Sequence, residues 1–568
     1  MISCHFISCS LLLLVFPFRW AVKAWEISDV PAPDLFLRRG LANVAVFGNF
    51  LYIDGGEVSQ LDAEGKPYTL NNNTRGSQAM NSTLSIDLSK SWSTTNVTLR
   101  EIPKEPHGMD RQALWKREDT NSLYIWGGHG PNTGRLLDES LSTGFWRFQT
   151  DGAGGGQWSK ETPINPTEFK ELQRSEDGAF ASTPEGGFWF GGSADLRTRL
   201  NRTDGKTNTA VQPTPGMVHY DWRTNQWSNE TEEFKAAFPP FGTMKGAKAL
   251  YVPNYGTSGL VFLLGGFMST LEPFEDGRNS VYGWMDFSKI TFMDPVSKKW
   301  FSQNATGPAP TRRQWFCMVG VEGKSSYEIF VFGGVAEYKD TPYDDVFVLS
   351  LPGFVWKQVL YDSRFPRTEH HCGVIGKRQM VIVGGRNTTK TSQENVAGWA
   401  LPDPWPQGLG LFDMKEWIWK SEYNATAEKY ESHQEIESWY REIGTASVTW
   451  SSDEAKSFFL PKSEAISAGA IAGAVVGAVA GVALLVLMVY WAIRRSRKRP
   501  ETKPVMGLSL PEERGVKDKA VYSLIQLGEM DARPCRVEMA ANSSPQSELP
   551  GSQSHAVELD ARQDHNRL

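Results

Sequence analysis

The sequence predicts an all-β protein, a β-propeller of six blades, followed by one membrane-spanning helix and a disordered tail. Three observations lead to this prediction. A short apolar run that ends in two glycines occurs six times, most of these runs are followed by a second strand with an Asp and a Trp, and a long uncharged segment near the C-terminus precedes a basic cluster. At 568 residues the chain is longer than one ordinary core needs, so we expect one large domain with appendages.

Residues 1–24 are predicted to be a signal peptide. The apolar run Ser10–Phe18 is followed by small Val22 and Ala24, in the positions that a signal peptidase recognises. The basic residue that usually precedes such a run is missing, so an internal apolar segment is the alternative. Eight N-x-S/T glycosylation sites favour entry into the secretory pathway. They are Asn72, Asn81, Asn96, Asn201, Asn229, Asn304, Asn387 and Asn424.

The glycine pairs define a repeating unit within residues 25–424. Their first members lie at positions 55, 127, 191, 265, 333 and 384, which indicates a radial β repeat of about 50 residues with inserted loops. A strand that is apolar on both faces, such as Met380–Val383, has to be covered on both sides, and sheets packed around an axis cover it. Glycine then tolerates positive φ and close backbone approach where the strand leaves. Six units of four strands predict six blades, while Trp25–Val30 or Thr445–Trp450 could close the ring or help to form a seventh blade.

The repeat resembles the kelch repeat from about Gly40 to Trp419. After the glycine pair, phrases such as "LSIDLSKSW" (Leu84–Trp92) and "VHYDWRTNQW" (Val218–Trp227) supply a turn-forming Asp and a large Trp. A WD40 propeller is disfavoured because no Trp-Asp dipeptide occurs. Three further stretches resemble a family of fungal kelch-repeat membrane proteins: Arg312–Val321, Gly376–Gly385 and Leu401–Met414. That resemblance implies a signal peptide, a propeller, a single spanning helix and a short tail, but no settled biochemical activity.

The C-terminal quarter is predicted to be a membrane anchor with its flanks. Residues 425–465 read as a partly helical stalk, and residues 466–493 carry no charge over a length that can span a bilayer. The basic cluster Arg494–Arg499 predicts that the following side is cytoplasmic, which gives a type I topology. Residues 494–568 are expected to be disordered.

Two short signals accompany this anchor. Glycines at every fourth position predict helix-mediated homodimerisation, although small residues are also ordinary in spanning helices. These glycines are Gly469, Gly473, Gly477 and Gly481. In the tail, Tyr522–Ile525 ("YSLI") matches a tyrosine-based sorting signal.

The sequence gives no positive sign of an enzyme, a metal or a cofactor. A net charge of −6 offers no reason to expect nucleic acid, and no H-E-x-x-H or G-x-S-x-G motif occurs. The alternative is a copper-radical oxidase similar to galactose oxidase, which needs two His, two Tyr and a cross-linked Cys. His370, His371 and Cys372 are its candidates together with His219 and Tyr220, but the tyrosine pair cannot be assembled from them.

Two groups of residues stand out near the starts of two inner strands. Polar and aromatic side chains there predict a binding site at one end of the central channel, or else salt bridges that line a structural channel. They are Arg312, Arg313, Trp315, Arg367, Glu369 and His370. Cys317 and Cys372 each follow an Arg by five residues, so they form either a disulfide between neighbouring blades or two buried thiols.

The sequence thus predicts a single-pass membrane glycoprotein in the plasma membrane or an endomembrane. Its propeller would lie outside the cytoplasm and act as a binding platform for a protein or a carbohydrate. The two alternatives are the copper-radical oxidase and a cell-polarity or cell-wall marker that is positioned through its cytoplasmic tail.

Overall fold

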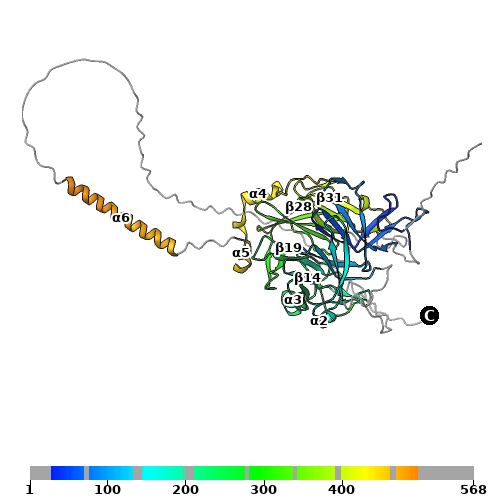
Figure 1. Cartoon of the computed structure of the whole chain (residues 1–568). Helices are drawn as coiled ribbons and strands as arrows, with labels where there is room; N and C mark the ends of the chain where they lie inside the picture. The colour runs from blue at the N-terminus through cyan, green and yellow to red at the C-terminus, as the bar shows by residue number, and fades with distance from the viewer. Residues whose placement is uncertain are drawn as a thin grey trace, which may run out of the picture. The chain divides into compact units, whose positions relative to one another are not determined.

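The computed structural model describes residues 27–69, 76–131, 144–195, 197–198, 210–274, 281–336, 342–390, 398–460 and 468–496. For Lys390 and residues 468–480 only the backbone is described. The predicted signal peptide, most of the predicted tail and the Tyr522–Ile525 signal lie outside the described residues. The chain divides into two compact units, Met1–Ser467 and Ala468–Leu568, and each is described by itself (Figure 1).

The described part of the first unit contains six antiparallel sheets of four strands, each in chain order. Sheet 1 has β2 (Asn43–Phe47), β3 (Phe50–Asp54), β6 (Ser82–Asp87) and β8 (Arg100–Pro103), and sheet 2 has β9 (Asp110–Arg117), β10 (Ser122–His129), β11 (Phe145–Thr150) and β12 (Gly156–Glu161). Sheet 3 has β13 (Ala179–Ser182), β14 (Gly186–Phe190), β17 (Met217–Asp221) and β18 (Trp227–Asn229), and sheet 4 has β19 (Lys248–Val252), β20 (Leu260–Leu264), β23 (Lys289–Met293) and β24 (Trp300–Asn304). Sheet 5 has β25 (Cys317–Glu322), β26 (Tyr327–Phe332), β27 (Val346–Leu351) and β28 (Val355–Val359), and sheet 6 has β29 (His371–Ile375), β30 (Gln379–Val383), β31 (Leu409–Asp413) and β32 (Ile418–Lys420).

Smaller elements join or extend these sheets. The short sheets are β1 (Phe36–Gly40) with β4 (Glu57–Gln60) and β5 (Gln78–Ala79), β15 (Ser193–Ala194) with β16 (Gln212–Pro213), and β21 (Phe267–Ser269) with β22 (Val281–Trp284). A fourth pair, β7 (Trp92–Ser93) with β33 (Glu422–Tyr423), connects the region of sheet 1 to the chain that follows sheet 6. Short helices are α2 (Pro166–Glu171), α3 (Thr231–Ala237), η1 (Thr388–Lys390) and η3 (Pro406–Gly408).

The first strand of every sheet packs against the first strands of two other sheets. The order is β2, β9, β13, β19, β25 and β29, and β29 in turn packs against β2. The second strands carry the apolar runs of the sequence, and β3, β10, β14, β20, β26 and β30 are buried almost throughout. This burial on both faces is what the sequence pattern predicts for strands between packed sheets.

The glycine pairs connect one sheet to the next. In all six pairs the second glycine donates its backbone N–H to a carbonyl just before the next sheet, at 2.6–3.0 Å. The series begins with Gly56 and Met109, and it ends with Gly385 of sheet 6 and Arg39 before sheet 1. A Cβ at Gly56 would lie 2.4 Å from the carbonyl oxygen of Gly40, and its φ is +80°. Glycine is therefore required here by both the backbone conformation and the close approach of the neighbouring chain.

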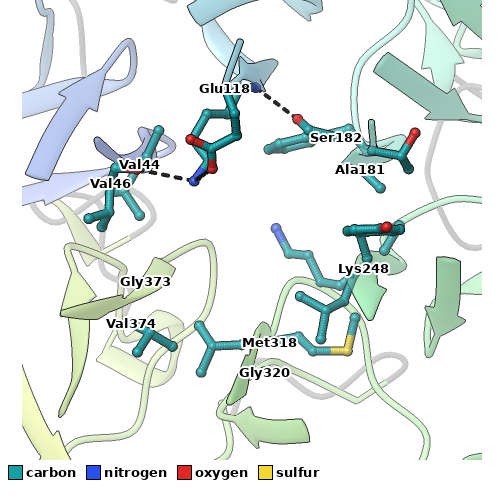
Figure 2. Close-up of a pocket in the computed structure, with 18 of the residues that line it drawn as sticks. Val44, Val46, Glu118, Ala181, Ser182, Lys248, Met318, Gly320, Gly373 and Val374 are labelled. Atoms are coloured by element: carbon teal, nitrogen blue, oxygen red, sulfur yellow. Dashed lines mark hydrogen bonds and ion pairs between the residues drawn. The ribbon is translucent and has the colours of Figure 1, made fainter. Parts of the chain in front are cut away.

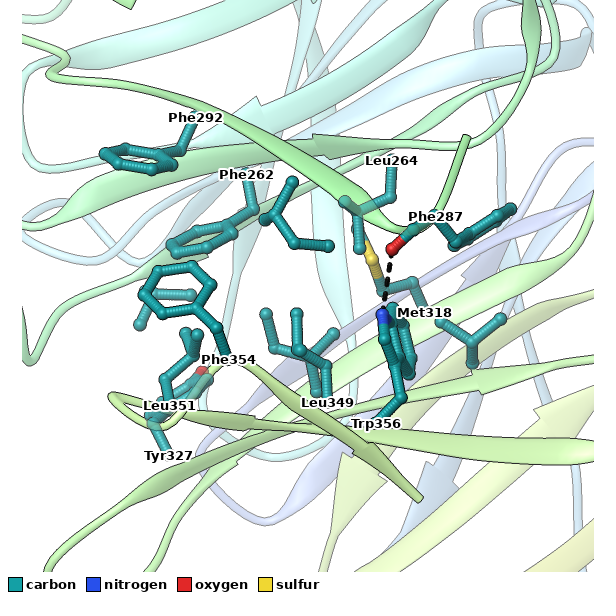
Figure 3. Close-up of a cluster of buried hydrophobic side chains, with 14 of the residues drawn as sticks. Phe262, Leu264, Phe287, Phe292, Met318, Tyr327, Leu349, Leu351, Phe354 and Trp356 are labelled. Carbon is teal, nitrogen blue, oxygen red and sulfur yellow. Dashed lines mark hydrogen bonds between the residues drawn. The ribbon is translucent and has the colours of Figure 1, made fainter. Parts of the chain in front are cut away.

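Apolar clusters fill the space between neighbouring sheets. Between sheets 4 and 5, Phe262 and Phe292 face Leu349 and Leu351 (Figure 3). Trp356, the tryptophan of the fifth repeat, is fully buried in this cluster and donates its indole N–H to the carbonyl of Phe287 at 2.8 Å. The tryptophan thus occupies the gap between sheets that the repeat pattern suggests for it.

The segment predicted to be a stalk packs on the sheets instead. It contains α4 (Gln434–Glu442), η4 (Thr445–Ser447) and α5 (Asp453–Phe459). Ile436 is buried in the cluster between sheets 5 and 6, and Phe459 in the cluster between sheets 4 and 5. The stalk prediction is wrong for residues 425–460, because these apolar side chains have a partner surface on the sheets.

The second unit is described as one helix, α6 (Ala468–Ser496), which covers most of the segment predicted to span a membrane. Gly469, Gly473, Gly477 and Gly481 all lie within it. Among the residues that the structure describes, no helix is both long and apolar enough to cross a membrane.

Candidate functional site

Each sheet has its longest internal connection between its second and third strands. Because neighbouring strands are antiparallel, these connections all leave from the end at which the first strands begin. We call this end the loop end and the opposite end, with its short turns, the hairpin end. The short sheets β15–β16 and β21–β22 belong to connections at the loop end.

A ring of backbone hydrogen bonds lies at the loop end, near the starts of the first strands. Six equivalent residues have positive φ, between 53° and 69°, and we call them the axial ring: Leu41, Arg111, Asp177, Gly246, Trp315 and Glu369. Five of the six neighbouring pairs are joined by N–H to carbonyl bonds of 2.8–3.1 Å, and one of these runs from Leu41 to Glu369. The ring leaves only a cavity of about 40 Å³ at this point of the axis.

The axial ring is also charged. Arg111 pairs with Asp177 at 2.9 Å, with Glu176 at 3.2 Å and with Glu369. Burial opposes the charge on Arg111, but Asp177, Glu369 and Glu176 outweigh it and raise the pKa of Arg111. Trp315 donates its indole N–H to Asp177 at 3.0 Å. These contacts match the structural salt bridges that the sequence left open as an alternative to a binding site.

The residues predicted at the channel mouth fall into two groups. Trp315, Glu369 and His370 line the small cavity at the axial ring. His370 is buried, with Nε2 3.1 Å from the carbonyl of Phe332, and burial holds its pKa well below the ordinary value. Arg312 is exposed on the connection between β24 and β25.

Arg313 and Arg367 are the exceptions, because they do not reach the channel. Arg313 is fully buried, pairs with Asp345 and donates to the carbonyl of Gly333 at 2.9 Å. Arg367 pairs with Asp403 at 3.1 Å and lies 3.4 Å from the centre of the Trp405 ring. Each arginine satisfies a carbonyl of a glycine pair inside the fold, which explains why a polar residue occurs at this position.

The larger cavity lies toward the hairpin end of the axis and has a volume of about 620 Å³. All six first strands contribute to its wall, which includes Val44, Phe180, Ala181, Met318 and Val374 (Figure 2). The sequence did not suggest this site, because each first strand contributes only two to four ordinary strand residues to it.

Lys248, the first residue of β19, projects into this cavity (Figure 2). Burial lowers the pKa of Lys248 to about 8. Lys116, a second lysine in the wall, bonds to the carbonyl of Val46 at 3.3 Å and pairs with Glu118 at 2.5 Å. His371 stacks on Phe180, with ring centres 5.9 Å apart, and burial lowers its pKa to about 3.

The residues proposed for a copper site have other contacts. Cys372 forms a disulfide with Cys317, with Cα atoms 5.7 Å apart, between β29 and β25. His219 stacks on Phe188 with ring centres 4.3 Å apart, while Tyr220 lies in an aromatic cluster of sheets 2 and 3. Across the described ranges there is no group of three or more His, Cys, Asp or Glu that could hold a metal ion.

Six of the eight predicted glycosylation sites fall within the described residues. Five of them are exposed: Asn81, Asn96, Asn229, Asn304 and Asn424. Asn387 is half-buried, and Asn72 and Asn201 lie outside the described residues.

Comparison with known proteins bears on the fold. A kelch repeat-containing protein of Arthroderma benhamiae is 26% identical over 434 residues. The chain is similar to kelch-repeat proteins. The match covers 69% of this chain but only 58% of that relative, so the chain spans little more than half of its length. A solved structure described as "Structure of YjhT" is 12% identical, with a TM-score of 0.42, over 68% of this chain and 97% of that one. No family model matches the chain.

Proposed function

We propose that the six sheets are the blades of a closed kelch-type propeller, and that its loop end is a binding platform for a protein or a carbohydrate. The observation that carries this proposal is the position of the long connections. In repeat proteins, insertions that occur at the same place in every repeat collect on one face, and that face is often the binding face. Here the connections of unequal length all leave from the loop end.

The scaffold beneath these connections favours the same role. The glycine bonds between sheets and the axial ring hold the strand ends in fixed positions, so the connections start from a rigid base. Binding residues are often found on loops that a rigid scaffold positions. Tyr282 of β22 is 54% exposed at this end, and its ring contacts that of Phe241 edge to face at 5.2 Å. Exposed aromatic side chains are frequent anchors in protein and sugar recognition.

We further propose that the chain is a single-pass type I membrane glycoprotein that pairs through α6. Five exposed asparagines in glycosylation motifs support an ectodomain outside the cytoplasm. The uncharged stretch Ala465–Ile493 followed by Arg494–Arg499 supports a stop-transfer segment.

The platform is tested with the purified full chain on a glycan array and, in cells, with a photo-crosslinker placed at Tyr282. Selective binding that Tyr282→Ala weakens supports the proposal. The matched control is Ile418→Ala, because Ile418 is 42% exposed at the start of β32, at the hairpin end. Equal losses in both variants, or no ligand in either format, would exclude the loop end as the platform.

The membrane setting has its own test. Treatment of the cell-derived chain with peptide N-glycosidase should lower its apparent mass, and Asn304→Gln should remove one step of that change. Alkaline carbonate extraction should leave the chain in the membrane pellet, and release into the supernatant would contradict the proposed spanning helix.

A further inference from the structure

The cavity at the hairpin end contains a cation without a partner. Lys248 projects into it, and within the described part of the chain its ammonium group has no hydrogen-bond or ion-pair partner. Lys248 is half-buried, and holding its charge partly out of water without a paired anion costs free energy. An unpaired cation that faces an open cavity therefore indicates that its counter-charge comes from outside the chain.

The carboxylates near Lys248 are already engaged. Asp177 raises the pKa of Lys248, but it is shared by Arg111 at 2.9 Å and Lys245 at 3.4 Å. Glu369 pairs with Arg111 and Arg386. Both carboxylates belong to the axial ring, where they neutralise the arginines rather than Lys248.

The remaining titratable groups of the cavity wall add no net negative charge. His370, just before β29, and His371, the first residue of β29, both have pKa values lowered by burial, so both are neutral near pH 7. Lys116 of β9 is compensated by Glu118, and Arg117 of the same strand is compensated by Asp119. The electrostatic balance of the cavity is thus one uncompensated ammonium group.

The rest of the wall suits an apolar molecule. Val44 and Val46 of β2, Phe180 of β13, Met318 of β25 and Val374 of β29 present side chains to the same space. A volume of about 620 Å³ lies within the usual range of small-molecule sites. Apolar surface buried against these residues would stabilise a bound ligand.

We propose that this cavity binds an apolar monocarboxylate, whose carboxylate accepts a hydrogen bond from the Lys248 ammonium and whose hydrocarbon body lies against the apolar wall. Hydrogen bonds between ionised groups are roughly twice as strong as neutral ones, so the lysine selects the anion. The inference goes beyond the binding platform and does not depend on it, because the cavity lies toward the opposite end of the axis from the long connections.

The proposal is tested by calorimetric titration of the full chain in lipid nanodiscs, with empty nanodiscs subtracted. The probe is 4-phenylbutyrate, and 4-phenylbutanol is its uncharged counterpart. The acid should bind at least about tenfold more tightly than the alcohol, and Lys248→Met should remove that preference. Lys248→Arg should keep it, because it preserves the charge.

The matched control is Lys116→Met combined with Glu118→Gln, since it removes a lysine of the same wall together with its partner and leaves the net charge of the cavity unchanged. Its effect on the affinity for the acid should be less than about twofold. Equal affinities for acid and alcohol, or equal losses in the two lysine variants, would overturn the proposal. Failure of the glycan and crosslinking experiments at the loop end would leave it standing.

A second readout does not require a variant to fold. Affinity for 4-phenylbutyrate should fall as the pH rises through about 8, where Lys248 loses its proton while the carboxylate stays ionised. The probe should also protect Lys248 from acetylation by acetic anhydride, measured by peptide mass spectrometry. A flat affinity between pH 7 and pH 9, or no protection, would contradict the proposed contact.

Discussion

At the residue scale, single glycines allow the backbones of neighbouring sheets to approach closely, and substitutions can test this. Gly56→Ala places a Cβ 2.4 Å from the carbonyl oxygen of Gly40 at a φ of +80°. We expect it to lower the free energy of unfolding by at least about 3 kcal/mol, because strain and a backbone clash add. Gly152→Ala is the control, since Gly152 has a φ of +72° with nothing within 4 Å of its Cβ.

The control separates the two causes. Gly152→Ala should cost only about 1 kcal/mol, which is the conformational strain alone. Urea denaturation followed by tryptophan fluorescence measures both variants. Equal losses would mean that the close approach of the neighbouring sheet contributes nothing to the requirement for glycine at position 56.

Glu328 should make stability depend on pH. It is fully buried on β26, and burial raises its pKa to about 7 despite hydrogen bonds from Ser326 and Ser350. Because its folded pKa lies above its unfolded value, the folded chain binds more protons between these two values. Stability should therefore fall as the pH rises from about 4.5 to about 7, by about 3 kcal/mol, and then level off.

Glu328→Gln should flatten this slope, measured as the melting temperature across that pH range. Glu322→Gln changes an exposed carboxylate on the neighbouring strand β25 and should leave the slope as it is. A wild-type slope that survives in Glu328→Gln would show that other groups cause it.

At the scale of elements, the disulfide between β25 and β29 links sheets 5 and 6. It joins residues 55 positions apart, and a cross-link of that length stabilises a fold by about 4 kcal/mol in the chain-entropy model. The double variant Cys317→Ser, Cys372→Ser should lose roughly that much stability in denaturant titration. Reducing agent should lower the stability of the wild type toward the variant and leave the variant unchanged, and any other result would argue against the bond.

The positions of the strands can be predicted from local sequence patterns, whereas the tertiary contacts of individual side chains cannot. Runs such as Met380–Val383 show their burial by composition alone, so the second strands and their glycine exits are predictable. Arg313 and Arg367 look like surface anchors in the sequence, because their partners Asp345 and Asp403 come from distant connections. The segment that contains Ile436 and Phe459 resembles a stalk for the same reason, because a short amphipathic segment does not reveal the surface that it covers.

At the scale of the whole molecule, the six-fold pattern was predictable but the features on the axis were not. The axial ring depends on equivalent backbone conformations at residues as different as Leu41, Gly246 and Glu369, so no side-chain pattern marks it. Lys248 begins an ordinary alternating strand, and only the convergence of six strands gives it a cavity. A ring or cavity to which each repeat contributes only a few residues cannot be recognised in the sequence before the repeats are arranged around an axis.

If the six sheets form one closed ring, damage at the pairing of β7 with β33 should affect sheets 1 and 6 together. Tyr423 of β33 is buried there, donates its hydroxyl to the carbonyl of Leu88 at 2.9 Å and contacts the ring of Trp92 at 5.1 Å. Tyr423→Ala should cost about 3 kcal/mol or more and should raise amide hydrogen exchange in β2 and β3 as well as in β29 and β30. Tyr220→Ala, which removes an equally buried tyrosine from sheet 3, should raise exchange in sheets 2 and 3 instead. Exchange that rises in sheet 6 alone after Tyr423→Ala would mean that sheets 1 and 6 are not coupled and that the ring is open.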